Sequence, residues 1–190
     1  PTTPTTTGST TVSGSVSATL DTMSPAAGSV IKGASTKVAI FKLTNTGSAA
    51  AKVTSVKMKR TGVSSDSTLN NVYLYSGDAR LTDAASVASG MINFSDTAGI
   101  VSIPANSSIT LGVMVEILDA TSVNIGETVG VMLTEVVADG VAVAGLPISG
   151  AQQTVVGKPS GMTGISYGTT IPATGSYVDP QADYVVWQNT

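Results

Sequence analysis

Hydrophobic and polar residues alternate along much of the chain from Val12 onward. The longest unbroken alternation runs over residues 109–117, where every second residue carries an aliphatic side chain. Because successive side chains of a strand point to opposite faces, this period of two predicts strands with one apolar face each. The same pattern, in shorter form, predicts strands over residues 16–20, 39–44, 53–58, 72–75, 91–94 and 129–133.

Short segments rich in glycine, asparagine and aspartate separate these strands. They are Asn45-Thr-Gly, Ser76-Gly-Asp, Ala98-Gly, Asn124-Ile-Gly and Asp139-Gly. Such residues adopt positive φ or bond their own backbone, as chain reversals require. Helix signals are weak throughout. Strands spaced by about 8 to 12 residues with turns between them favour an all-β fold, an antiparallel immunoglobulin-like β-sandwich.

The first eleven residues differ from the rest of the chain. Residues 1–11 hold eight Ser or Thr, two Pro and one Gly, with no apolar side chain to bury. This composition predicts an extended Thr/Pro-rich linker, open to O-glycosylation. We expect the β-sandwich module itself to occupy residues 12–157.

The end of the chain echoes an earlier part of it. Pro172-Ala-Thr-Gly-Ser repeats the pattern of Pro25-Ala-Ala-Gly-Ser, and in this alignment Trp187 takes the position of Phe41. A repeat of this kind is typical of tandem modules. We therefore expect residues 158–190 to be a linker and the opening strand of a second, similar module, with Trp187 in its core.

The composition argues against an enzyme. The chain has no histidine and no cysteine, and only 11% of its residues are charged. The commonest general base, thiol nucleophiles and disulfides are therefore all absent. Two carboxylate pairs, Glu116 with Asp119 and Glu127 with Glu135, fit a glycosidase only formally, because no aromatic sugar platform lies near them in sequence. We expect no enzymatic activity.

Charge is unevenly distributed along the chain. Residues 1–60 hold seven Lys or Arg and one acid, whereas residues 61–190 hold two Lys or Arg and eleven acids. The basic side chains of residues 1–60 could form one face that meets the acidic part of a neighbouring copy or an anionic cell-wall polymer. Alternatively, they could be scattered over solvated strand faces. The overall acidity disfavours nucleic-acid binding. The basic residues are Lys32, Lys37, Lys42, Lys52, Lys57, Lys59 and Arg60.

Three groups of residues are candidates for binding or modification. Loop aspartates could ligate calcium, although turn formation and solvation are the favoured explanation because no segment has the spacing of a calcium loop. Tyr73 and Tyr75 share one face of a strand and could stack on a sugar, or they could cover the edge of the core. Asn93 and Asn106 begin formal N-glycosylation triplets, and Asn106, in a proline-led turn, is the one expected to be exposed. The loop aspartates are Asp66, Asp78, Asp83 and Asp96.

Four longer runs carry a resemblance to a known class of proteins. The chain resembles β-sandwich repeats of large bacterial cell-surface proteins, including surface-layer-like proteins of small-genome bacteria. The resemblance covers about residues 13–156 and the partial copy over about residues 165–190, and it transfers no catalytic residue. The runs are Val38-Ala-Ile-Phe-Lys-Leu-Thr-Asn, Val53-Thr-Ser-Val-Lys-Met-Lys-Arg-Thr-Gly, Leu69-Asn-Asn-Val-Tyr-Leu-Tyr-Ser-Gly and Ile103-Pro-Ala-Asn-Ser-Ser-Ile-Thr-Leu-Gly-Val-Met-Val.

The resemblance implies a secreted protein at the cell surface that binds copies of itself. We expect a structural subunit of a surface layer or filament, with cell-wall polymers or glycans as further partners. The alternative is an adhesin or carbohydrate-binding module of a longer surface protein. No cofactor is expected, with calcium as the open alternative. No run of about 20 apolar residues occurs, so we expect no transmembrane segment.

Overall fold

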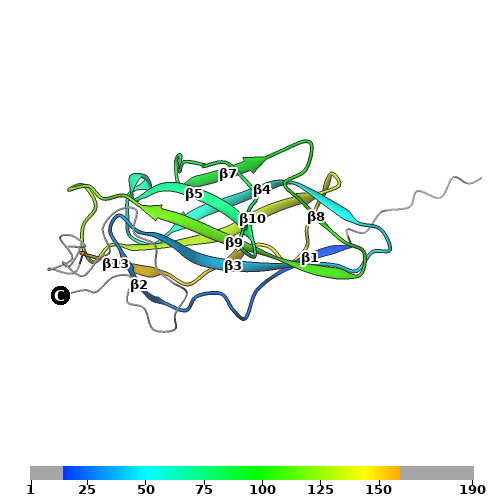
Figure 1. The fold of residues 1–190 in the computed structure, drawn as a ribbon, viewed down its shortest axis with the longest axis horizontal. Coiled ribbons are helices and arrows are strands. Elements are labelled where there is room, and N and C mark those ends of the chain that lie inside the picture. The colour runs from blue at the N-terminus through cyan, green and yellow to red at the C-terminus, as the bar shows by residue number, and fades with distance from the viewer. Residues whose placement is uncertain (1–14, 159–190) are drawn as a thin grey trace, which may run out of the picture. The chain divides into compact units, whose positions relative to one another are not determined.

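The computed structural model describes residues 15–158, which form two β-sheets whose strands run lengthwise in Figure 1. The first sheet has five strands in the order β1-β3-β9-β5-β6, all paired antiparallel. Its strands are β1 (Val16–Leu20), β3 (Ser35–Asn45), β9 (Ser107–Ile117), β5 (Leu69–Ser76) and β6 (Ala79–Arg80).

The second sheet has five strands in the order β2-β13-β10-β4-β7, with three short strands attached to it. The main strands are β2 (Gly28–Ile31), β13 (Gln153–Val156), β10 (Thr128–Ala138), β4 (Ala51–Thr61) and β7 (Met91–Ser95). The short strand β8 (Val101–Ile103) pairs with β4, whereas β11 (Val141–Ala142) and β12 (Ile148–Ser149) pair with β10. A single 3-10 turn, η1 (Asp66–Thr68), precedes β5.

The strand order confirms the predicted β-sandwich. In immunoglobulin domains, strands A, B, E and D form one sheet and strands C, F and G form the other. Here β1, β3, β9 and β5 form the first set, and β4, β10 and β13 form the second. Strands β2 and β7 lie outside this order, as do the short strands β6, β8, β11 and β12. β7 extends the second sheet beside β4, and β2 pairs parallel with β13, so the sandwich is not purely antiparallel.

The core lies between the sheets and is built by the alternation seen in the sequence. Phe41 and Leu111 of the first sheet and Met58 and Leu133 of the second are fully buried, and belong to one continuous apolar cluster. Burial of such side chains stabilises the fold by about 1.5–3 kcal/mol each. One expectation fails: Leu20 is 43% exposed, because it is the last residue of the edge strand β1.

Some expectations concern residues outside the described range. The linker over residues 1–11 falls there, as does the predicted linker and opening strand over residues 158–190, with Trp187, except for its first residue. Within the described residues, no helix has the length and apolar character needed to cross a membrane.

Candidate functional site

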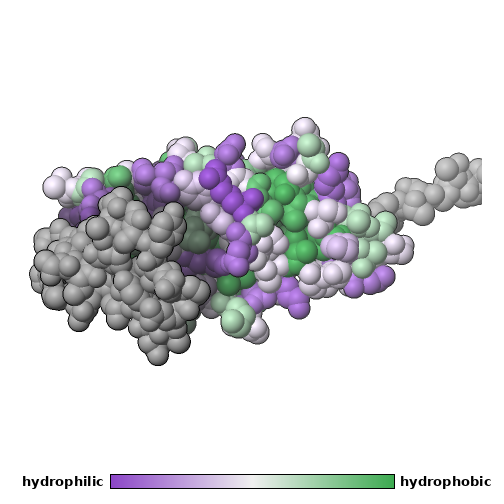
Figure 2. Space-filling model, viewed as in Figure 1, coloured by the Kyte–Doolittle hydropathy of each residue, from purple (hydrophilic) through white to green (hydrophobic). Residues whose placement is uncertain are grey.

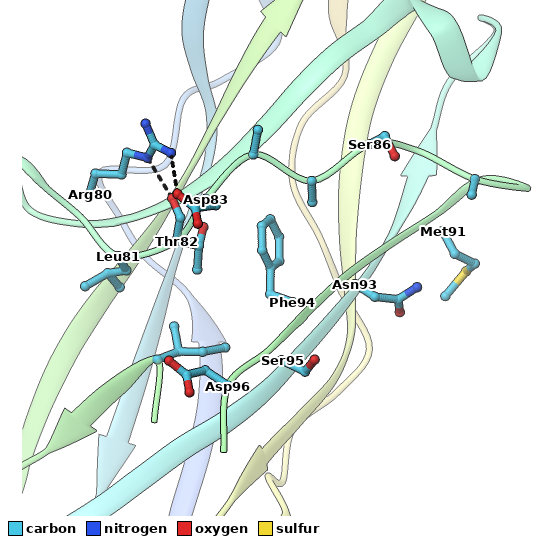
Figure 3. A pocket seen from close by; sticks show the side chains of 14 residues that line it. Arg80, Leu81, Thr82, Asp83, Ser86, Met91, Asn93, Phe94, Ser95 and Asp96 are labelled. Carbon is cyan, nitrogen blue, oxygen red and sulfur yellow. Dashed lines mark hydrogen bonds and ion pairs between the residues drawn. The ribbon is translucent and has the colours of Figure 1, made fainter. Parts of the chain in front are cut away.

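An open groove lies at the edge of the sandwich, between the connecting segment of residues 81–88 and strand β7 (Figure 3). Its volume is about 820 Å³. Leu81, Ala85, Phe94 and Ile100 give it an apolar floor, and the ring of Phe94 points into the space between the two walls. Figure 2 shows hydrophobic residues gathered on this side of the molecule beside a band of hydrophilic ones.

The groove forms because its walls belong to different sheets. Leu81 donates its N–H to the carbonyl of Leu74 at 2.8 Å, and Ala85 exchanges two bonds of 2.9 Å with Val72, which ties this segment to β5. Three residues later, Ala88 pairs with Met91 of β7 through bonds of 2.9 and 3.0 Å. The segment therefore crosses from one sheet to the other and leaves a gap between itself and β7.

Strand β7 presents an unpaired edge to this groove. At its two ends, the carbonyl of Gly90 accepts a hydrogen bond from the N–H of Arg60, and the N–H of Asp96 donates one to the carbonyl of Thr54. The even-numbered residues of this segment therefore form their backbone hydrogen bonds with β4. Alternate residues of a strand direct their backbone groups to opposite sides. Asn93 and Ser95 therefore point their N–H and C=O groups away from β4, where the sheet has no further described strand.

The opposite wall also carries unpaired backbone groups. Ala84 and Ser86 flank Ala85, whose N–H and C=O both bond β5, and neither of them makes a backbone hydrogen bond within residues 15–158. In an extended segment the neighbours of Ala85 face the other way, toward the groove. Both walls thus offer exposed donors and acceptors above an apolar floor.

Two of the aspartates considered for calcium line this groove, and each has local partners. Asp83 accepts from Arg80 at 3.1 Å, and Asp96 Oδ1 accepts from the N–H of Ala98 at 2.8 Å. Asp78 lies in the tight turn after β5. Across residues 15–158, no three or more Asp or Glu side chains gather closely enough to hold a metal ion.

Asp66, the fourth candidate, pins the loop before β5 to the turn before β7. Its Oδ2 accepts from the N–H of Gly90 at 2.9 Å, and its Oδ1 accepts from Arg60 Nε at 3.0 Å. The bond from Gly90, followed by the one from Arg60, holds the pKa of Asp66 below its ordinary value. This carboxylate is engaged in a structural ion pair.

The two tyrosines share one face of β5, as predicted; it is the outer face of the first sheet, and both side chains are half-buried. Tyr73 donates its hydroxyl to Glu116 at 3.1 Å, and Arg80 lies over its ring at 4.6 Å from the centroid. Burial, with the bond to Glu116, raises the pKa of Tyr73. Because Arg80 covers one face of the Tyr73 ring, Tyr75 is the freer of the two for stacking on a ligand.

The structure gives the four carboxylates of the predicted pairs separate surroundings. Glu116 accepts from Asn71 at 2.6 Å as well as from Tyr73, and the Asn71 bond is the largest reason why the pKa of Glu116 is lowered. The N–H and side chain of Asn124 bond Glu127 and lower its pKa in the same way. Asp119 lies just beyond β9, and Glu135 forms an ion pair with a lysine across β4 and β10.

The basic residues do not form one face. Lys37 and Lys42 lie on β3 in the first sheet, whereas Lys52, Lys57 and Lys59 lie on β4 in the second. Because the apolar side of each strand fills the core, the lysines point outward on opposite sides of the sandwich. The other two basic residues act inside the fold: Lys32 Nζ donates to the carbonyls of Ala120 and Val123 at 2.8 and 2.7 Å, and Arg60 binds Asp66.

The candidate glycosylation site Asn106 lies in the turn between β8 and β9. It is exposed, as expected, and its φ of 49° is one that asparagine tolerates. Asn93 is exposed too, against the expectation that only Asn106 would be, because it sits on the outer face of an edge strand. The sequence therefore missed the exposure of β7, which borders the groove.

Comparisons with known proteins identify no family. No protein-family model and no curated protein matches the chain. Among solved structures, the chain is similar to AvmM, which catalyses macrocyclization in alchivemycin A biosynthesis, with 14% identity over 78% of this chain and 93% of that one and a TM-score of 0.43.

Two further structures show similarity of the same low level. A family 123 glycoside hydrolase from Clostridium perfringens is 14% identical over 69% of this chain and 22% of its own, with a TM-score of 0.41. A PapD-like domain of human CEP192 is 11% identical over 76% of this chain and 86% of its own, with a TM-score of 0.30. Similarities this weak carry no argument about function.

Proposed function

We propose that this chain is a structural module of a bacterial cell-surface protein that associates with copies of itself. The observation that carries the proposal is the unpaired edge of β7, with Asn93 and Ser95 facing a groove with an apolar floor. An exposed edge of this kind is a template for pairing with another chain.

The edge of the first sheet at β1 supports this interpretation by contrast. The edge of β1 is covered by the segment at Ala144, which accepts from Ala18 at 2.8 Å and donates to Val16 at 3.1 Å. Edge strands are commonly guarded by charged residues or proline. Strand β7, Met-Ile-Asn-Phe-Ser, contains neither, so nothing in its own sequence opposes the approach of another strand.

Location and assembly type follow from the sequence rather than from the fold. The resemblance to bacterial surface-protein repeats, the Thr/Pro-rich start and the repeated pattern near the end all favour a secreted, tandem-repeat protein of the cell envelope. Such modules would build a surface layer or a filament, because each copy would present the same set of complementary surfaces to its neighbours.

The test is direct observation of assembly by the full chain. Negative-stain electron microscopy and sedimentation velocity over a rising concentration series, with calcium and with a chelator, are expected to reveal sheets, fibres or growing oligomers. A calcium requirement would appear as assembly that the chelator abolishes. A single monomeric species at every concentration and in both conditions would refute the proposal.

A second candidate function is glycan binding by the outer face of the first sheet. Tyr75 lies on this face opposite Gly112 of the neighbouring strand, where the Lys37 side chain packs over the glycine, and it remains partly exposed. Aromatic rings exposed in this way can stack on sugars. A glycan array would test this: a signal that Tyr75→Ala abolishes supports it, and a blank array removes it.

A further inference from the structure

We propose that the groove beside β7 binds residues 162–168 of a second copy as an added strand. This inference rests on the proposed function and names the contact through which the copies associate. It follows from three features of the molecule: the unpaired backbone on both walls, the apolar floor, and the composition of the segment that follows the last described strand.

The walls of the groove are suited to an extended backbone. On one side Asn93 and Ser95 direct two N–H and two C=O groups into it, two residues apart, as they would toward a neighbouring strand. On the other side Ala84 and Ser86 offer further unpaired groups at the same spacing. A strand between the walls would satisfy both, and main-chain bonds of this kind provide the affinity in strand addition.

The floor of the groove determines which side chains the added strand can carry. Phe94 and Ile100 are 6% and 8% exposed, and Leu81 and Ala85 are packed against the same core. Side chains at alternate positions of an added strand would face this floor, and those between them would face solvent. The bound segment must therefore carry apolar residues two apart, with small or polar residues between them, and no charge on the buried face.

Residues 162–168 meet these requirements. Their sequence is Met-Thr-Gly-Ile-Ser-Tyr-Gly, within a run over residues 159–178 that contains no charged side chain. Ile165 and Tyr167 are two apart and would face the floor together, leaving Ser166 on the solvent side. The other terminal segment fits poorly, because residues 1–14 contain Val12 as their only aliphatic side chain.

The order of the second sheet favours a second copy over the same copy. Strand β13, from which residues 162–168 follow, is separated from β7 by β10 and β4. A segment bound in its own groove would have to pass around both strands within a few residues. Because each copy would carry one groove and one donor segment at different places, the contact is heterologous and extends copies into a chain.

Two variants of the full chain test the donor. Ile165→Lys puts a charge on the buried face and should weaken self-association by about tenfold or more, measured by sedimentation velocity. Ser166→Lys adds the same charge one residue away, on the solvent face, and should change association by less than about twofold. Both positions lie outside the described sandwich, and thermal unfolding followed by circular dichroism checks that its stability is unchanged.

Cysteine cross-linking tests whether the segment enters the groove and whether it comes from a second copy. The chain has no cysteine of its own, so each introduced cysteine is unique. In the bound state Ser166 would lie on the same solvent face as Ser95 or Asn93, depending on register. A mixture of Ser166→Cys with Ser95→Cys or Asn93→Cys should form a disulfide-linked dimer on mild oxidation. The control partner, Ser29→Cys, is also an exposed serine in an edge strand, at the opposite edge of the sheet.

The outcomes separate this inference from the proposed function. Assembly that Ile165→Lys and Ser166→Lys weaken equally, or not at all, would overturn the inference while leaving self-association in place. A disulfide that forms only within the monomer of a double variant would show that the groove holds its own segment, which also overturns it. An unmodified chain that never associates would refute the proposed function itself.

Discussion

Asn45, at the end of β3, should be one of the most costly polar side chains to remove. It is 1% exposed. Its amide nitrogen donates to the carbonyls of Ala49 at 2.8 Å and Ile103 at 3.1 Å. Its Oδ1 accepts from the N–H of Gly47 at 2.9 Å and from the hydroxyl of Ser15 at 3.0 Å. Asn45→Ala would therefore remove these four hydrogen bonds and a fifth, to the carbonyl of Pro104 at 3.3 Å, which together join β3 to two loops and to the residue before β1.

The size of the effect follows from what happens to the partners that lose these hydrogen bonds. A hydrogen bond contributes about 1 kcal/mol net, and a buried group left without a partner costs about 1–3 kcal/mol. Ala49 is exposed and can bond water, whereas the carbonyl of Ile103 lies in the interior. We expect a loss of about 3 kcal/mol in the free energy of unfolding, which lowers Tm by about 6–12 °C for a chain of this size.

Urea and thermal unfolding of the full chain, followed by far-UV circular dichroism, measure this loss. Asn93→Ala is the matched control, because Asn93 is also a strand asparagine but is exposed, with no side-chain hydrogen bond to a described residue. The control should change stability by less than about 0.5 kcal/mol. If Asn45→Ala costs no more than the control, the reasoning that Asn45 joins these loops is wrong.

A second variant at the same position adds a dependence on pH. Asn45→Asp keeps the shape but turns an acceptor toward the carbonyls of Ala49 and Ile103. The folded state then disfavours the ionised form, so the pKa of the introduced carboxyl is higher folded than unfolded. The loss of unfolding free energy caused by Asn45→Asp should be small in acid and grow as the pH rises through about 4. A penalty independent of pH would contradict this account.

Two further predictions concern the backbone and an ion pair. Gly62 has a φ of +94°, and a Cβ there would overlap the carbonyl of Thr128, so Gly62→Ala should cost about 3 kcal/mol in unfolding free energy. Gly77→Ala, at a φ of +57° with open space around it, should cost only about 1 kcal/mol. The pKa of Asp66 is lowered from 3.8, so its bonds to Arg60 and its neighbours stabilise the fold fully above that value and are lost as the pH falls below it. Asp66→Asn should therefore destabilise the protein at neutral pH. The difference between the unfolding free energies of the variant and the unmodified chain, measured in urea, should disappear in acid.

The long strands could be predicted because each has one buried and one exposed face. Residues 109–117 show this most clearly, and they form β9 over nearly the same range. The short strands β2, β6, β8, β11 and β12 span two to four residues, too few for a period of two to be visible. Their pairing depends on tertiary position, as does the parallel pairing of β2 with β13.

The candidate site was harder to predict because its chemistry lies in the main chain. The sequence singled out Asp83 and Asp96, which do line the groove, but for metal binding rather than for strand pairing. The backbone groups of Asn93 and Ser95 are chemically the same as those of any strand residue. Only the position of β7 at the end of the sheet leaves them unpaired, and no local pattern of side chains encodes that position.

The position of β7 also explains why apolar residues lie at the base of the groove. The seven strands that match the immunoglobulin order close their own core, and β7 extends the second sheet beyond β4. The first sheet ends at β6, which has only two residues, so it provides no comparable strand to lie opposite β7. The inward side chain of Phe94 is therefore covered by a connecting segment rather than by a sheet. A strand added beside β7 would lengthen the second sheet and pack its inward side chains beside Phe94 and this segment, so backbone pairing and hydrophobic contact favour the same site.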